Sequence, residues 1–465
     1  MFGLRRRGWL SVVGAGVSVL ASAAFTGGVG GASTSSSTIT YTVHPIAVQA
    51  TSSTSVAALT PGYCVATFGL ACYTPQVIHT AYQIPWTIDG QAAGTGQSIA
   101  IIDAYGSPTV QSDLNTFDTA FGLPPTTVNI YYPGGSPTVN PLKNATQAGW
   151  AEETSLDVQT AHALAPGAKI NLIVAASPAG NVLNNALNYV VTNHMGDVMS
   201  MSYGAPEAAI AGGGNNLQVS QADTIFQRAA GQGMSVFASA GDNGGSNGYA
   251  SANALFPASD PFVTSVGGTD LFVKALSSKH STSYAYSSEY TWNDSDPTTC
   301  PFGCTYGVFG ATGGAPSSIF AAPTYQQGVT GQSMRTTSDV SFNASVYTAT
   351  MIYLGFLGES NDGFYFFGGT SESAPSWAAI TADLNQARGS DLGQFNPRLY
   401  AIAGTSSYAK DFHDVTVGND QLPFPTGAGF AAGRGYDMPT GLGTPIVTGL
   451  LATFAPGATY SLTQP

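Results

Sequence analysis

The stretch Gly368-Gly-Thr-Ser371-Glu-Ser-Ala-Pro375 follows the apolar, aromatic run Gly363–Phe367 and leads directly into a helical pattern over Ser376–Ala387. A serine at this point lies at a helix N-terminus, where unpaired N–H groups and the helix dipole favour developing negative charge. The glycines before it let a substrate backbone approach closely. This arrangement is typical of a nucleophilic serine, although Gly-Thr-Ser before a helix is also an ordinary N-cap.

Upstream of this stretch, short apolar runs alternate with helical patterns. Strands are expected at Ser98–Ile102, Ile170–Ala175, Val198–Ser202, Ser235–Ala238 and Val263–Val266, and helices at Val110–Phe121, Trp150–Leu164, Leu183–Asn193 and Val219–Gly231. The alternation predicts an α/β fold with a doubly wound, mostly parallel sheet and helices on both faces. After Gly267 the pattern is loop-rich up to Ser371.

Polar residues follow three of the expected strands: Asp103, Ser202-Tyr203-Gly204 and Asp242. In open parallel sheets, sites form where strands end, so these groups are expected to converge with Ser371. A single aspartate at a strand end is more often a helix cap or turn former.

Glu153 and Asp157 lie four residues apart in one helical pattern and therefore project from the same face. Two carboxylates that share a site split their pKa values, as an acid–base pair requires. The alternative is an acidic patch facing solvent. Glu152 is a less favoured substitute for Glu153 because it lies five residues from Asp157.

A serine nucleophile usually has a histidine as its base, but none of the six histidines stands in a Gly-rich motif that opens a helix. His162 is nearest to the carboxylates, yet its spacing of five from Asp157 turns it to a different side. We expect it to be structural or on the surface.

Composition narrows the function class. The 465 residues carry a net charge of −13, and only 8% are charged, without a basic patch, so nucleic acid is a poor partner. Acid unfolds proteins mainly by protonating carboxylates that are paired in the folded state, and a chain with few charged residues has few such pairs to lose. A Ser/Thr/Gly-rich secreted surface would have the same composition.

The N-terminus is expected to direct export. Met1–Ala24 reads as a signal peptide, residues 25–63 as a low-complexity linker or tail, and ordered structure is expected to begin near Cys64. No other segment is long and apolar enough to span a bilayer. We therefore expect a secreted protein with no membrane contact once the signal is removed.

The four cysteines form two close pairs, Cys64 with Cys72 and Cys300 with Cys304. In an exported chain, local disulfides are the expected interpretation. A metal site is the alternative, but no histidine lies beside either pair.

Taken in order, these motifs resemble the sedolisin family of serine-carboxyl peptidases. The matching blocks are Glu153-Thr-Ser-Leu-Asp157, Ser239-Ala-Gly-Asp242 and Gly368–Pro375, and they keep this order within Tyr73–Pro445. The resemblance implies a subtilisin-like catalytic domain over residues 64–465. It further implies that Ser371 is the nucleophile, Glu153 its general base, Asp157 the residue that tunes Glu153, and Asp242 a hydrogen-bond donor to the oxyanion.

These roles are chemically consistent. If Asp242 donates to the oxyanion, its carboxyl must be protonated, whereas Glu153 must be partly ionised to act as a base. Reference pKa values near 4 for both residue types mean that the two conditions are met together in acid. Asp103 would lie behind these residues or on the substrate side. Tyr203 stands where the family often carries tryptophan.

A fourth block resembles the family's calcium loop, and it implies one structural Ca²⁺ ion. Its expected ligands are the carboxylates of Asp414 and Asp437 and the carbonyls of Val415, Gly433 and Gly435. Without the resemblance, a Gly-rich surface turn would be favoured.

The resemblance therefore predicts a secreted, acid-active, monomeric peptidase of peptides or proteins, acting endoproteolytically or as a tripeptidyl-peptidase. Family members are usually made with a long folded prosegment, and only a short polar stretch precedes the catalytic pattern here. We accordingly expect folding without a covalent prosegment, and little effect from deleting residues 25–60. The rivals are a histidine-dependent subtilase and a catalytically inactive relative that serves as a binding or surface protein.

Overall fold

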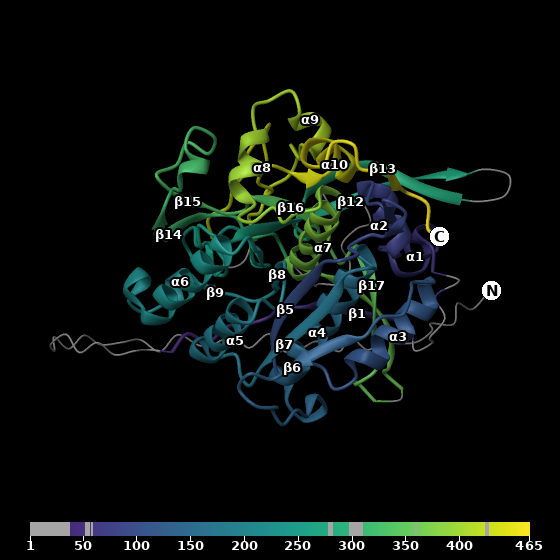
Figure 1. Cartoon of the computed structure of the whole chain (residues 1–465), viewed down its shortest axis with the longest axis horizontal. Coiled ribbons are helices and arrows are strands. Elements are labelled where there is room, and N and C mark those ends of the chain that lie inside the picture. Colours follow the sequence, from purple (N-terminus) through teal and green to yellow (C-terminus); the bar gives the residue numbers. More distant parts are fainter. Residues whose placement is uncertain are drawn as a thin grey trace, which may run out of the picture.

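The computed structural model describes residues 38–51, 56, 59–277, 282–296, 310–358, 360–423 and 427–465 (Figure 1). Its main sheet has eight strands in the order β13-β12-β10-β8-β5-β7-β6, with β16 also paired to β12. All neighbours in it run parallel except β12 and β13. The main-sheet strands are β5 (Ser98–Ala104), β6 (Val128–Tyr131), β7 (Lys169–Ala175), β8 (Val198–Met201), β10 (Ser235–Ser239), β12 (Thr264–Ser277), β13 (Thr282–Thr291) and β16 (Val340–Asn343).

A second sheet of four strands has the order β1-β18-β17-β2. Its strands are β1 (Ile46–Thr51), β2 (Ala71–Tyr73), β17 (Thr348–Leu354) and β18 (Gly363–Gly368). The remaining strands are short: β3 (Thr87–Ile88), β4 (Gln91–Ala92), β9 (Ala205–Pro206), β11 (Leu255–Phe256), β14 (Pro316–Ala321), β15 (Met334–Thr336), β19 (Phe412–His413), β20 (Thr444–Pro445) and β21 (Tyr460–Ser461).

Helices cover both faces of the main sheet, and Figure 1 shows α7 at the centre of the molecule. The helices are α1 (Pro61–Phe68), α2 (Pro75–Tyr82), α3 (Val110–Phe121), α4 (Ala145–Leu164), α5 (Gly180–Thr192), α6 (Leu217–Gly231), α7 (Thr370–Arg388), α8 (Asn396–Ile402), α9 (Tyr408–Asp411) and α10 (Val447–Phe454). Alternate residues of β5 point to opposite faces. Ile99 and Ile101 join the core that contains α4 and α7, whereas Ala100 and Ile102 join the core that contains α5 and α6. The predicted doubly wound fold is confirmed.

Two helices begin earlier than the sequence patterns indicated. Helix α4 begins at Ala145 because the side chain of Asn144 caps it by accepting the N–H of Gln147. Helix α7 begins at Thr370 and contains Pro375. The region expected to be loop-rich, from Gly267 to Ser371, instead supplies most of β12 and six further strands, which include β16, β17 and β18.

The expectation that ordered structure begins near Cys64 is wrong for the part of the tail that the structure describes. Strand β1 pairs antiparallel with β18, whose other edge pairs with β17. The backbone of β18 is buried, and buried N–H and C=O groups need partners. Strand β1 supplies them, so deleting residues 25–60 would strip a paired strand from β18.

The disulfide between Cys64 and Cys72 is confirmed. The pair Cys300 and Cys304 and the expected signal peptide lie outside the described residues. Within the described ranges, no helix has the length and apolar character needed to cross a bilayer.

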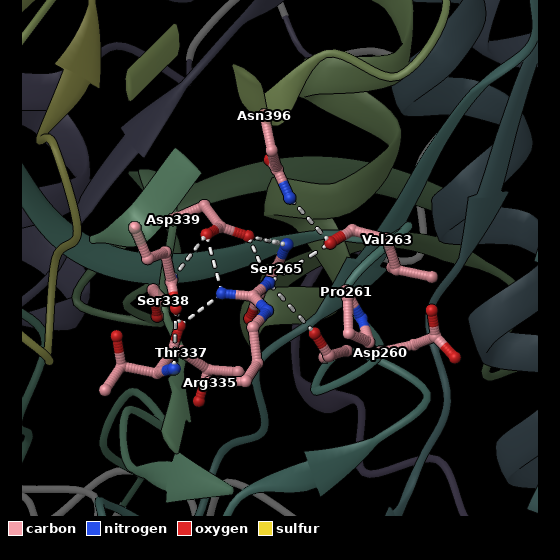
Figure 2. A network of polar contacts seen from close by, with 12 residues as sticks. Asp260, Pro261, Val263, Ser265, Arg335, Thr337, Ser338, Asp339 and Asn396 are labelled. Carbon is pink, nitrogen blue, oxygen red and sulfur yellow. Dashed lines mark hydrogen bonds and ion pairs between the residues drawn. The ribbon is translucent and has the colours of Figure 1, made fainter. Parts of the chain in front are cut away.

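A buried ion pair fixes the turn between β15 and β16 (Figure 2). The guanidinium of Arg335 contacts both carboxylate oxygens of Asp339, at 2.7 and 2.5 Å, and it donates to the carbonyl of Val263 at 3.1 Å. Asp339 in turn accepts the N–H of Ser265 on β12. The network joins β16 to β12, and the chain just beyond β16 receives the N–H of Gly369, the residue that precedes α7.

Candidate active site

Ser371 is the second residue of α7, and its side chain is almost completely buried. The preceding Gly369 has φ of 122°, a conformation that favours glycine, and a Cβ there would lie 2.9 Å from Oδ2 of Asp242. Gly369 occupies the N-cap position, and no side chain caps the helix. The interpretation of Ser371 as an ordinary N-cap is therefore wrong.

Pro375 explains how the first turn of α7 is held. Proline has no N–H, so the carbonyl of Ser371 lacks the donor that a residue four positions later would normally give. The hydroxyl of Ser202, just after β8, lies 3.2 Å from that carbonyl and 2.7 Å from Oδ1 of Asp157. The helix that begins at Thr370 and contains Ser371 is thus tied to a strand end and to a carboxyl group.

Glu153 and Asp157 lie on one face of α4, which packs against α7, and both are fully buried. The alternative of a solvent-facing acidic patch is wrong. Burial, and then the charge of Asp157, raise the pKa of Glu153 well above its usual value. Neither oxygen of Glu153 accepts a hydrogen bond of normal geometry from the described residues, although the nearby hydroxyl of Ser371 favours its ionised form.

Asp103, near the end of β5, is the third member of a carboxyl cluster with Glu153 and Asp157. It is fully buried, and burial raises its pKa to about 7. Burial and the charge of Asp103 together raise the pKa of Asp157 well above its usual value. Asp103 therefore lies close enough to Glu153 and Asp157 for its charge to raise both of their pKa values, and it does not line the pocket that opens onto Ser371.

Asp242 lies three residues after the end of β10 and contacts Thr370, the residue before Ser371. Its Oδ1 accepts the N–H and the hydroxyl of Thr370, at 2.8 and 2.7 Å. Its Oδ2 lies beside Gly369 and makes neither bond. Burial raises the pKa of Asp242, while the two bonds from Thr370 oppose the rise. A protonated Oδ2 would be placed to donate a hydrogen bond next to Ser371.

The remaining candidates of the sequence analysis are separate from this cluster. Glu152 points elsewhere: burial raises its pKa to about 7, and its charge acts on Tyr365 of β18. His162 is buried, lies 3.3 Å from Asp118, and contacts the carbonyl of Pro124. Its structural role is confirmed.

A pocket of about 210 Å³ opens onto Ser371 and Asp242. Sequence reasoning missed one of its walls, which consists of Thr42, Val43 and His44 from the supposed tail. The signal was present, because Ile39-Thr-Tyr-Thr-Val-His44 alternates apolar and polar residues, as a half-buried strand does.

The expected calcium ligands lie together near the C-terminal end of the domain. Both oxygens of Asp414 accept the N–H of Gly435, and Oδ2 of Asp437 accepts the N–H of Gly433. Val415 is buried beside them. Gly435 has φ of 73°, as a turn that needs glycine would, whereas Gly433 lies outside the left-handed region.

The charges in this loop suit a cation. Burial, with a smaller contribution from the charge of Asp414, raises the pKa of Asp437 to about 7, although hydrogen bonds from Gly433 and Thr440 oppose the rise. A divalent ion between two such carboxylates would relieve their repulsion. Within the described residues, however, no group of three or more His, Cys, Asp or Glu side chains is placed to hold a metal. Backbone carbonyls would have to supply the remaining ligands.

Comparisons with known proteins agree with this geometry. Residues 142–403, more than half of the chain, match the Subtilase family. Kumamolisin of Bacillus sp. (strain MN-32) is 33% identical over 84% of this chain and 65% of its own length. Sedolisin of Pseudomonas sp. (strain 101) is 32% identical over 79% of this chain and 59% of its own length.

A solved structure shares the fold as well as the sequence. Pseudomonas sedolisin, described as a serine-carboxyl proteinase and complexed with two molecules of pseudo-iodotyrostatin, superimposes with a TM-score of 0.67. It is 30% identical, and the match covers 83% of this chain and 98% of that one. The chain spans less than two thirds of the length of the two sequence relatives.

Proposed function

We propose, from the premise that this chain belongs to the sedolisin family within the subtilases, that it is a serine-carboxyl peptidase active in acid. The observation that carries the proposal is that the side chain of Ser371 is buried close to the carboxyl groups of Glu153, Asp157 and Asp242. His44 is the one described histidine that lines the pocket, and it comes from an extended segment instead of a helix. Its ring contacts the hydroxyl of Thr42, and within the described residues no hydrogen bond joins it to Ser371, which counts against the histidine-dependent alternative.

In the proposed reaction, Ser371 attacks the peptide carbonyl while its hydroxyl proton passes to the carboxylate of Glu153. The acyl-enzyme forms when the leaving amine takes up a proton, and water then releases the acyl group by the reverse sequence. Asp242, protonated, donates a hydrogen bond to the oxyanion. Asp157 holds Glu153 in place and, through its own proton, limits the negative charge of the pair.

The carboxyl cluster explains why acid is expected to suit this chemistry. Like charges in one buried site repel, so the cluster keeps protons that exposed carboxylates would lose. The adjacent Ser371 hydroxyl opposes part of the rise in the pKa of Glu153, and we assign the one negative charge of the Glu153–Asp157 pair to Glu153. Rising pH would ionise Asp242 and remove the oxyanion donor, whereas falling pH would protonate the base.

The substrates are proposed to be peptides or proteins, and the enzyme to act as a secreted monomer. Asp414 and Asp437, with the carbonyls of Val415, Gly433 and Gly435, are proposed to hold one structural calcium ion. Such an ion would join the loop after β19 to the C-terminal end of the domain.

The test is hydrolysis of acid-denatured protein at pH values from about 3 to 5 and at pH 8, with Ser371→Ala as the control. Acid-dependent cleavage that Ser371→Ala loses would support the proposal. Activity at pH 8 alone would contradict acid chemistry. Equal, negligible activity of both proteins would favour an inactive relative.

A further inference from the structure

Two buried aspartates outside the carboxyl cluster, Asp270 on β12 and Asp294 three residues after β13, are joined by one hydroxyl group. Asp270 is 4% exposed and Asp294 2%, and Ser345, which supplies the hydroxyl, is fully buried. This hydroxyl donates to Oδ1 of Asp294 at 2.9 Å, and it also hydrogen-bonds the carboxyl of Asp270. Ser345 thus connects β12 and the loop after β13 to the turn after β16.

The number of hydrogens at Ser345 limits the charge of this pair. A hydroxyl donates one hydrogen bond and can accept two. One accepted bond comes from the N–H of Tyr347 at 3.1 Å. Whichever carboxyl receives the hydroxyl hydrogen, the other must supply a hydrogen of its own. Asp294 is the better carboxylate because its Oδ2 also accepts the N–H of Gly310 at 3.2 Å, so Asp270 is the member expected to carry the proton.

The surroundings of Asp270 agree with this assignment. Burial, and then the charge of Asp294, raise the pKa of Asp270 well above its usual value. Asp296 adds a further negative charge nearby. The other titratable groups that face Asp270 are Tyr290, opposite it on β13, and Tyr73 of β2. Burial and like charges therefore favour one retained proton over two ionised carboxylates.

A chain of hydrogen bonds leads from Asp294 to Asp242. The backbone N–H of Asp294 donates to the carbonyl of Gly310 at 2.9 Å, in addition to the bond that its side chain accepts from this residue. The next residue, Ala311, donates its N–H to the carbonyl of Asp242 at 3.1 Å and accepts the N–H of Gly244 at 3.0 Å. Asp242 is also close enough for its charge to act on Asp294. The loop that contains Asp242 is therefore supported from Asp294.

A second chain of hydrogen bonds leads from Ser345 to the start of α7. Ala344, which precedes Ser345, accepts the N–H of Gly369. It also donates its own N–H to the carbonyl of Thr269 on β12 at 2.9 Å. Gly369 is the N-cap residue of α7 and lies beside Oδ2 of Asp242. The two carboxyl groups thus lie where both supports of the proposed oxyanion donor begin.

We propose that Asp270 and Asp294 are positioning residues that share one proton through Ser345. With this proton in place, the loop of Asp242 and the residue before α7 are held beside each other, as an oxyanion donor next to a nucleophile requires. Loss of the proton as pH rises would leave two carboxylates at one hydroxyl, and their repulsion would loosen both supports. The inference deepens the proposed peptidase function and rests on it for the link to turnover.

Asparagine and alanine at position 270 separate a hydrogen-bond donor from a group that only fills space. In Asp270→Asn the amide donates to Ser345 at every pH. Its kcat in acid should therefore stay near that of the parent, and the decline of kcat with rising pH should begin at a higher pH. Asp270→Ala offers no donor, so kcat should fall by up to about 10²-fold with little change in KM, because the reacting groups are misplaced.

Asp113→Asn is the matched control for the pH profile. Asp113 is a buried aspartate on α3, and burial raises its pKa to about 7. It hydrogen-bonds Thr109 and belongs to neither chain of bonds that leads to Asp242. Its replacement should leave the dependence of kcat on pH unchanged.

Amide hydrogen exchange, followed by mass spectrometry at pH 8, tests the positioning without turnover. The segments that contain Ala311 and Gly369 should exchange faster in Asp270→Ala than in Asp270→Asn, because their N–H groups bond Asp242 and Ala344. If Asp270→Ala does not fold, Ser345→Ala takes its place, since it removes the hydroxyl that joins the two carboxyl groups.

The outcomes separate this inference from the proposed function. Impairment of Asp270→Asn as severe as that of Asp270→Ala, a pH profile of Asp270→Asn like that of the parent, or an equal shift in Asp113→Asn would overturn the shared proton. Equal exchange in the two variants at position 270 would overturn the positioning. A parent that hydrolyses nothing would count against the proposed peptidase, whereas slower exchange in Asp270→Asn would still support the carboxyl pair.

Discussion

The hydroxyl of Ser202 donates to Oδ1 of Asp157 at 2.7 Å. The hydroxyl oxygen of Ser202 also lies 3.2 Å from the carbonyl oxygen of Ser371. Because Pro375 has no N–H, that carbonyl lacks its usual donor within the helix. A hydroxyl carries one hydrogen, so it can satisfy only one of these acceptors at a time. The protonation of Asp157 and the position of the first turn of α7, which contains Ser371, are therefore connected through Ser202.

Ser202→Ala should shift the pH dependence of activity. The bond from Ser202 lowers the pKa of Asp157, against the larger effect of burial. Without it, the carboxyl cluster should hold its protons more tightly, and the acid limb of kcat/KM should move up by about one pH unit. Ser200→Ala removes a buried hydroxyl of β8 that makes no hydrogen bond to the described residues. An equal shift in that control would show that the bond to Asp157 is irrelevant.

Glu153→Gln should abolish most turnover while leaving the fold intact. A general base contributes about 10²–10⁴-fold, and glutamine keeps the shape but cannot accept the proton. The measurement is kcat at the acid optimum, with thermal unfolding to confirm folding. Glu152→Gln is the matched control, because Glu152 is the adjacent glutamate on α4, is half-buried, and has its charge act on Tyr365 of β18. Near-normal turnover in folded Glu153→Gln would exclude Glu153 as the base.

Asp242→Ala should reduce kcat by about 10²–10³-fold, the range for losing one oxyanion donor. Asp242→Asn should retain more activity because its amide still donates, and its oxygen can still accept from Thr370. The advantage of the asparagine should grow as pH rises, because only the aspartic acid can ionise and so lose the proton that it donates. Identical pH profiles for the two variants would rule out donation by Asp242.

The site could be predicted from sequence wherever local spacing decides geometry. Asp103 and Asp242 follow apolar strands, and parallel strands end at one edge of a sheet. Glu153 and Asp157 share a helix face because they are four residues apart. In each case a few neighbouring residues fix the direction of the side chain.

Long-range pairing could not be predicted in the same way. Strand β1 forms because it can pair with the free edge of β18, which lies hundreds of residues later in the chain. The sequence of residues 46–51 does not identify that partner. The contact of Ser202 with the Ser371 carbonyl likewise depends on a missing N–H at Pro375. In both features the contacting segments are far apart in the sequence, so local sequence patterns do not identify the partners.

The protein should be less stable at alkaline than at acid pH. Burial raises the pKa of Asp260 to about 8, and one of its oxygens has no hydrogen-bond partner among the described residues. A carboxyl whose folded pKa is raised gives stability that is complete below its unfolded pKa and is lost as pH rises through the folded value. Asp103, Asp113 and Glu289 are shifted in the same direction, to about 7.

Denaturant unfolding at pH 4.5 and pH 8.5 measures this loss. Asp260→Asn, which cannot ionise, should make the difference in unfolding free energy between the two pH values smaller. Asp89→Asn is the control, because the pKa of this exposed aspartate is lowered by bonds from Thr459 and so contributes in the opposite direction. A parent protein equally stable at both pH values would contradict the prediction.

Chelation should destabilise the protein if the loop of Asp414 and Asp437 holds calcium. A ligand that binds only the folded state stabilises it by about 2.7 kcal/mol when its free concentration is 100 times the dissociation constant. EDTA should therefore lower the Tm of the parent at pH 5, and much less that of Asp414→Ala, which lacks one carboxylate. Coordination requires ionised oxygens, so the effect of chelator should shrink at lower pH.

Asp391→Asn provides the matched control, because Asp391 is an exposed aspartate beside Gly233, just after α6, and should respond to EDTA as the parent does. Elemental analysis of the parent should find one calcium ion per chain. An unchanged Tm with chelator, together with no calcium in the purified protein, would reduce the block to a Gly-rich turn. In that case the hydrogen bonds from Gly433 and Gly435 to the two aspartates would be its whole structural purpose.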